Sequence, residues 1–195
     1  MRKFLFRQIY PDLHEDIPID FFPNFNPRVH VFHCAKATFY SPSDPSGTGG
    51  MRFDYIRATP SWRKGNPRYD TVFVETDPEK EGMAGMHIAR VFLLFSFIAD
   101  SVQYQCALVN WFSFIGDAPD ELTGMWMVSP DLEGDDMYLA VIHIDSILRA
   151  AHLIPCYGED FVADFQDIDA SETLNSFPSF YVNKYVDHHA NEIAS

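Results

Sequence analysis

The sequence predicts a mainly β fold with a minor helical part, organised as one small barrel-like or sandwich-like core. The first observation is that residues 86–155 hold the densest apolar runs of the chain, with polar turns between them. The second is that these runs are rich in β-branched and aromatic residues, which favours strands. The third is the number of short apolar segments with frequent turn signals, which is typical of small β barrels and sandwiches.

The chain is long enough for one domain with a real core, because 47% of its 195 residues are hydrophobic. We place this domain at 28–195 and a proline- and phenylalanine-rich N-terminal arm at 1–27. Three prolines between residues 17 and 27 predict an extended, irregular segment. Phe21, Phe22 and Phe25 are expected to cap the core. The alternative is an arm that docks on a partner.

Strands are expected throughout the domain. In the segment 69–76, Val72 and Val74 should lie on one face and Phe73 on the other, because side chains alternate along a strand. Residues 88–98 are apolar at nearly every position, which suits a strand buried on both faces, although a helix of that length has the same pattern. The expected strands are 28–40, 52–59, 69–76, 88–98, 104–112, 125–128 and 138–144.

Helix is expected in two places near the C-terminus. The first is one or two turns at 145–153, with Asp145 as the N-terminal cap and Pro155 beyond the end. The second is a closing helix whose apolar residues fall at helical spacing. Those residues are Tyr181, Val182, Tyr185, Val186 and Ala190. Residues 157–176 are polar and acidic and predict a loop.

The net charge of −14 opposes non-specific binding to nucleic acid, because phosphate contacts need cations. The charge is uneven, however. Residues 1–70 carry 10 of the 14 basic residues and 7 acidic ones, whereas the remainder carries 4 and 21. No stretch approaches the roughly 20 apolar residues that span a bilayer. The N-terminus lacks the apolar region of a signal peptide. We therefore expect an intracellular protein with no membrane partner.

A basic segment interleaved with aromatic residues is the strongest nucleic-acid signal. Cations follow phosphate while aromatic rings stack on bases. A solvated basic loop that complements the acidic remainder is the competing interpretation. The candidate nucleic-acid-binding residues are Arg52, Arg57, Trp62, Arg63, Lys64 and Arg68, with Tyr55 and Tyr69 between them.

Metal and catalytic sites are not expected. His30 and His33 point to opposite faces of a strand, and His188 and His189 diverge on a helix beside Asp187. The flanks of Cys156 and the nearby His152 are apolar, which raises a thiol pKa. The carboxylates Asp117, Asp120 and Glu121 favour a solvated turn. We predict no catalytic residue, no metal ligand and no cofactor.

Seven motifs resemble the C-terminal region of fungal Plavaka-type DNA transposase proteins, over about residues 29–195. They are Gly49–Arg52, Ile56–Arg63, Arg68–Val74, Ala107–Phe112, Thr123–Trp126, His143–Pro155 and Phe180–His189. The catalytic domain of that family lies upstream of the matched region. The resemblance therefore implies an accessory, non-catalytic module of a mobile-element protein, or a stand-alone descendant of one, and with it a nuclear location. The order of strands, hairpin and loops is also similar to SH3 and bromo-adjacent-homology barrels, which host many functions.

The leading hypothesis is a binding module that helps a transposase contact DNA, chromatin or its own catalytic domain. The basic segment would face phosphate. A face near Trp111, Phe112 and Trp126 would take a peptide or another domain. The alternatives are a metal-dependent hydrolase or nuclease that uses Asp187, the adjacent histidines or the Asp117–Glu121 loop, and a purely structural assembly domain.

Overall fold

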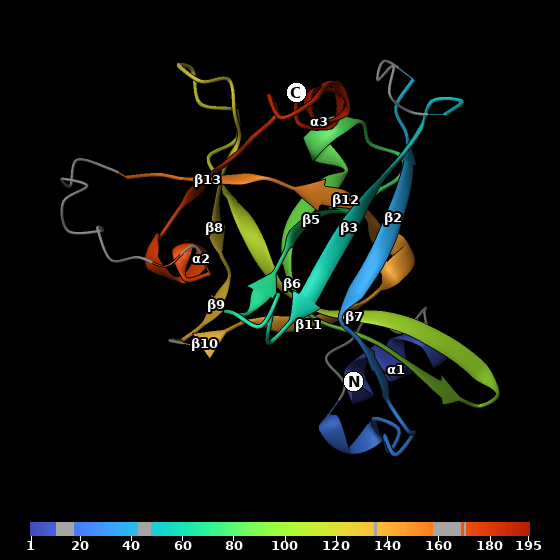
Figure 1. The fold of residues 1–195 in the computed structure, drawn as a ribbon. Helices are drawn as coiled ribbons and strands as arrows, with labels where there is room; N and C mark the ends of the chain where they lie inside the picture. The colour runs from blue at the N-terminus through green and yellow to red at the C-terminus, as the bar shows by residue number, and fades with distance from the viewer. Residues whose placement is uncertain (11–17, 43–47, 135, 158–168, 170) are drawn as a thin grey trace.

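A computed structural model describes residues 1–10, 18–42, 48–134, 136–157, 169 and 171–195 (Figure 1). The expectation of a mainly β fold is confirmed: the strands form a nearly closed, antiparallel, barrel-like sheet, with a small helix at the C-terminus. None of the helices in these described ranges is long and apolar enough to cross a membrane.

The main sheet has the strand order β12-β5-β6-β7-β8-β14-β13, with β1 beside β6 and β11 beside β7. A second sheet, β2-β3-β4, packs against β12 and β6, and β9 pairs with β10. The strands are β1 His30–Phe32, β2 Cys34–Tyr40, β3 Met51–Thr59, β4 Arg68–Tyr69, β5 Thr71–Glu75, β6 Met86–Ala99, β7 Val102–Ile115, β8 Met127–Pro130, β9 Leu132–Glu133, β10 Asp136–Met137, β11 Leu139–His143, β12 Ile147–Ala151, β13 Leu153–Pro155 and β14 Phe180–Val182. The helices are α1 Arg2–Ile9, α2 Thr173–Ser176 and α3 His188–Ile193, with single 3₁₀ turns at Ile19–Phe21, Gly82–Ala84 and Ile144–Ser146.

The long β6–β7 hairpin lies at the centre of the main sheet. Its turn has Asp100 and Ser101 at φ 49° and 65°, and Ala99 pairs with Val102. Two positive φ angles in a two-residue loop match the right-handed twist of the flanking strands. The predictions of a strand at 88–98, a turn after it and a return strand are thus confirmed, with both strands a few residues longer than expected.

Both faces of the central strands are buried. Val72 and Val74 of β5 point into one cluster, with Val91, Val109 and Ile56 of the second sheet. Phe73 points the other way, into a cluster with Phe112, Phe180 and residues of α3. The predicted alternation along β5 is confirmed. The burial of both faces explains why β6 is apolar at nearly every position.

The described part of the N-terminal arm packs on the free end of the hairpin. Phe4 and Leu5 of α1 are buried against Phe97 and Cys106. Phe25 lies edge-on to Phe97, with ring centroids 5.1 Å apart. Phe22 packs on α1 through Phe6, at 5.3 Å. Phe21, by contrast, is 72% exposed. The expected contact with the core is therefore confirmed for Phe25, whereas Phe22 contacts α1 and Phe21 is exposed.

Both predicted C-terminal helices are wrong over most of their length. After a 3₁₀ turn that contains Asp145, residues 147–151 form β12 and 153–155 form β13. Ile147, Arg149 and Ala151 are buried in alternation, which is the period of a strand. Tyr181 and Val182 lie in β14, and α3 begins only at His188. Short apolar segments fit either period, and pairing with distant strands decides between them. Within the expected loop, 173–176 forms α2, and 158–168 lie outside the described residues.

Candidate nucleic-acid interface

The loop between β3 and β4 brings the basic segment together. Trp62 receives a backbone hydrogen bond from Gly65 and donates one to Asn66, at 2.9 and 3.0 Å. Arg63 and Lys64 occupy the tip of this turn with φ of 51° and 65°. The chain then returns as β4, in which Arg68 pairs with Thr59 of β3. Residues on both sides of the loop therefore meet at its base.

Three guanidinium groups converge on one indole ring. The guanidinium carbons of Arg57, Arg63 and Arg68 lie 4.4, 5.3 and 5.4 Å from the ring centroid of Trp62. All three distances are within the range of cation–π attraction, which contributes about 0.5–1 kcal/mol per pair at exposed sites. We refer to these four residues as the Trp62 cluster. The ring gathers cations that would otherwise repel one another.

One carboxylate, that of Asp70, organises the cluster. It accepts a hydrogen bond from the Arg68 Nε–H at 2.7 Å and another from the backbone N–H of Arg57 at 2.9 Å. Arg68 remains 43% exposed in this pair. Among the described residues, the three positive charges meet the paired carboxylate of Asp70 and that of Asp169, which lies beside Trp62 and Arg68 and accepts from the Asn66 amide at 2.7 Å. A surplus of positive charge at a partly exposed indole is an arrangement that attracts an anion.

The other two basic candidates lie apart. Lys64 is exposed at the loop tip, next to Arg63. Arg52 is half-buried on the inward face of β3, opposite Phe39 of β2, and not on the face of Tyr55 and Arg57. The structure therefore brings together Arg57, Trp62, Arg63 and Arg68, leaves Lys64 at the rim and separates Arg52 from them.

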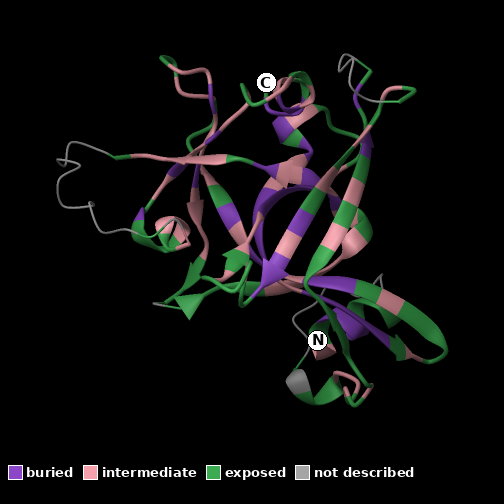
Figure 2. Ribbon diagram, viewed as in Figure 1, coloured by how far each residue is buried: buried purple, intermediate pink, exposed green. Residues whose placement is uncertain are grey.

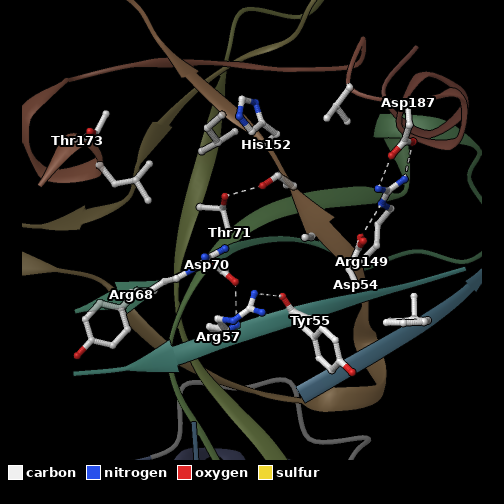
Figure 3. Close-up of a pocket in the computed structure, with 17 residues that line it drawn as sticks. Asp54, Tyr55, Arg57, Arg68, Asp70, Thr71, Arg149, His152, Thr173 and Asp187 are labelled. Carbon is white, nitrogen blue, oxygen red and sulfur yellow. Dashed lines mark hydrogen bonds and ion pairs between the residues drawn. The ribbon is translucent and has the colours of Figure 1, made fainter. Parts of the chain in front are cut away.

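A hollow of about 730 Å³ opens beside the cluster, between β3, β12 and the residues before α3 (Figure 3). Arg57, Arg68 and Asp70 line one end, and Asp54, Arg149 and Asp187 line the other. Three cations and three carboxylates thus share its wall. The hollow has no surplus charge of its own, so the positive surplus belongs to the Trp62 end.

Arg149 ties the opposite end of the hollow together. Its guanidinium N–H groups donate to both carboxylate oxygens of Asp187, at 2.8 and 2.7 Å, and its Nε lies 3.3 Å from Asp54. It also lies over the ring of Phe39, which stacks on His189 with centroids 4.7 Å apart. Arg149 itself is 5% exposed. This buried cation connects β12 with β3 and α3.

The proposed metal ligand Asp187, beside His188 and His189, is already engaged by other residues. The Asp187 carboxylate is engaged by Arg149 and also caps α3 by accepting from the Ala190 N–H at 2.8 Å. The hydrogen bonds from Arg149 hold the pKa of Asp187 at about 2. Burial and the nearby Arg149 lower the pKa of His189. Among the described residues, no three His, Cys, Asp or Glu side chains are grouped to hold a metal ion.

This pairing predicts a pH dependence of stability. Because the folded-state pKa of Asp187 is about 2 and the unfolded value is about 3.9, the unfolded state binds more protons between these values. The contribution of the pair is therefore complete above about pH 5 and is lost as the pH falls from about 4 to 2. Urea unfolding of the wild type and of Asp187→Asn, which keeps the cap, should show a stability difference that shrinks over this range. A difference independent of pH would contradict the assignment.

A second hollow, of about 400 Å³, lies on the other side of the cluster, between Trp62, Arg68 and Arg90. Arg90 is 5% exposed and donates to the side chain of Asn175 at 2.6 Å, while its Nε is buried without a hydrogen-bond partner among the described residues. Burial lowers the pKa of Arg90. Arg90 is not among the residues predicted from sequence, where a single cation inside an apolar run is the feature that marks it.

The expected partner-binding face of Trp111, Phe112 and Trp126 does not form. Phe112 is 1% exposed and packs in the core. Trp111 lies on the opposite side of β7, against the cluster of Val91 and Val109, whereas Trp126 packs beside Phe114 at 5.1 Å, against the cluster that holds Phe112. Neighbouring residues of a strand point to opposite faces, so Trp111 and Phe112 cannot share one. This hypothesis is corrected: Phe112 is a core residue.

The remaining chemical candidates have structural roles. Burial raises the pKa of the Cys106 thiol to about 11 and also raises that of Cys156. The imidazole of His152 contacts the Asn183 amide at 3.2 Å. Asp120 accepts from both the backbone and the hydroxyl of Thr123, at 2.8 and 2.7 Å, so it caps its own turn.

No family model, no curated protein and no solved structure matches this chain. The resemblance to a transposase C-terminal region therefore stays a prediction.

Proposed function

We propose that this chain is a non-catalytic binding module that contacts nucleic acid through the Trp62 cluster. The observation that carries the proposal is the convergence of Arg57, Arg63 and Arg68 on Trp62, within 5.4 Å of its ring centroid. Guanidinium groups bind phosphate with two parallel hydrogen bonds, and an indole stacks on a base. The cluster combines both kinds of contact within one loop.

Local charge supports the proposal in spite of the acidic whole. No acidic residue occurs from Tyr55 to Tyr69, a segment that contains four basic residues. The acidic remainder of the chain, residues 71–195, would repel a polyanion, and this repulsion would favour binding at the basic surface around Trp62. The same proposal includes a role as a transposase-like accessory module that contacts DNA or chromatin in the nucleus. A localised basic surface is compatible with this role.

The alternative of a metal-dependent hydrolase is less well supported. Its best candidate, Asp187, would have to leave a bidentate pair with a buried arginine before it could bind a cation. Breaking such a pair costs about 3–5 kcal/mol when one partner is left uncompensated. We therefore propose no catalytic role for this end of the molecule.

Replacing Arg57, Arg63 and Arg68 together with glutamine should abolish most nucleic-acid binding. Three phosphate contacts contribute about 2 to the slope of log K against log salt, so affinity should fall by about 100-fold at about 0.1 M salt. Fluorescence anisotropy of a labelled oligonucleotide, titrated at several salt concentrations, measures both quantities. The corresponding lysine variant should keep most of the salt slope, because it keeps the charges.

A matched control removes the same amount of charge elsewhere. Lys3, Arg7 and Lys80 are exposed and lie outside the cluster. Their combined replacement with glutamine should leave the salt slope near that of the wild type. Equal losses in the two triple variants would show that only net charge matters, and this result would contradict a site at Trp62.

A further inference from the structure

The outer face of the β2–β3 hairpin is an exposed aromatic surface that continues from the Trp62 cluster. Along both strands exposed and inward-facing residues alternate, as the banding in Figure 2 shows. The outward residues include Tyr40 of β2, at 61% exposed, and Met51, Phe53 and Tyr55 of β3, at 45–49%. We call these four residues, three aromatic and one methionine, the aromatic strip. Large side chains gathered on one exposed face mark a binding surface more often than isolated ones do.

Cations are interleaved with the strip. The Nζ of Lys36 lies 4.0 Å from the ring centroid of Phe53, and Phe53 and Tyr55 meet edge to face at 5.4 Å. The guanidinium of Arg57 lies 5.6 Å from Tyr55 and 4.4 Å from Trp62. A chain of contacts thus runs without interruption from Lys36 to the Trp62 cluster.

In the part of the hairpin that the structure describes, the outward faces of β2 and β3 carry no carboxylate. The register pairs Cys34 with Arg57, Lys36 with Tyr55, Thr38 with Phe53 and Tyr40 with Met51. The acidic residue of β3, Asp54, points inward, where it lies 3.3 Å from Arg149. The surface is therefore both aromatic and positively charged, on a chain whose net charge is −14.

We propose that this surface binds single-stranded nucleic acid, with bases stacked on Phe53 and Tyr55 and phosphates held by Lys36 and the arginines of the Trp62 cluster. The inference rests on the proposed function and deepens it by naming the substrate class. A strand whose bases are unpaired can offer their faces to exposed rings, whereas a duplex keeps its base faces stacked on each other and offers only its backbone and groove edges.

Stacking of a base on Phe53 is expected to be more favourable than the existing contact of Lys36 with that ring. Lys36 covers Phe53 at an exposed site, where a cation–π contact is weak. Stacking of a base on an aromatic side chain is stronger than such a contact. A base therefore displaces the lysine from the ring, and the freed ammonium group remains close enough to pair with the adjoining phosphate.

The test compares a fluorescent oligothymidine of about 12 nucleotides with a duplex of the same length, by anisotropy at about 0.1 M salt. Wild-type protein should bind the single strand more tightly. Phe53→Leu combined with Tyr55→Leu, which keeps apolar bulk but removes both rings, should weaken that binding by about 30-fold and leave duplex binding nearly unchanged. Phe32→Leu combined with Tyr138→Leu changes two exposed aromatic residues elsewhere and should have no effect.

The outcomes separate the two proposals. Equal affinity for both probes, with a normal salt slope and no effect of the Phe53 and Tyr55 substitutions, overturns the single-strand inference and leaves the Trp62 cluster as a backbone-binding site. Absence of saturable binding to either probe overturns both. If sedimentation instead shows that the wild type self-associates and the double leucine variant does not, the strip is a contact between copies of this chain, and the inference is again overturned.

Discussion

Replacing Phe112 with alanine is expected to lower the free energy of unfolding by about 4 kcal/mol. The side chain is 1% exposed, lies across from Ile88 of β6 and meets Phe180 edge-on with centroids 6.0 Å apart. Removing the ring leaves a cavity at the point where β6, β7 and β14 pack together, and β strands held in a closed sheet relax little. Chemical denaturation monitored by circular dichroism measures the loss.

The control for Phe112 is an exposed phenylalanine. Phe32 of β1 is 50% exposed, and its replacement with alanine should cost less than about 1 kcal/mol. A surface role for Phe112 makes the opposite prediction, namely a small loss of stability and a large loss of partner binding. Similar stability losses in the two variants would contradict the placement of Phe112 in the core.

Replacing Arg149 with methionine is expected to cost about 3 kcal/mol, although methionine has a similar length and is apolar. Arg149 is 5% exposed and forms ion pairs with both Asp187 and Asp54, so removal of the guanidinium leaves two carboxylates without their shared cation. Both carboxylates are partly exposed, and this places the cost at the lower end of the range for broken buried pairs. Urea unfolding at neutral pH measures it.

Two further variants separate charge from geometry at this position. Arg149→Lys keeps the charge but cannot form the bidentate pair, so its stability should lie between those of the wild type and the methionine variant. Arg68→Met removes an arginine from the exposed pair with Asp70 and should cost at most about 1 kcal/mol. A loss for Arg149→Met no larger than that for Arg68→Met would show that the buried network contributes little.

The central strands could be predicted from sequence because they are apolar at nearly every position and rich in β-branched and aromatic residues. β6 is apolar on both faces, and the alternation of Val72, Phe73 and Val74 follows directly from the geometry of a strand. The segments 147–155 and 180–182 could not be assigned in this way. Their apolar residues are few and fit a helix as well as a strand, and their strand character comes from pairing with β5, β14 and β8.

Only those contacts of the candidate site that join residues close in sequence could be predicted. Arg57, Trp62, Arg63 and Arg68 lie within one hairpin connection, so their proximity follows from the loop itself. The pair of Arg149 with Asp187 joins residues 38 positions apart, and the contact of Arg90 with Asn175 joins residues 85 apart. Contacts of this kind depend on the tertiary fold. The supposed face of Trp111 and Phe112, in contrast, fails on strand alternation alone.

The salt dependence of wild-type binding to a single-stranded oligonucleotide tests the central claim most directly. If the Trp62 cluster contacts phosphate, log K should fall linearly with log salt, and the three arginines should contribute about −2 to the slope on a single strand. The slope should become shallower by about 2 in the variant that lacks Arg57, Arg63 and Arg68. An affinity that does not change with salt, or a slope that the triple variant retains, would contradict a nucleic-acid interface at this loop.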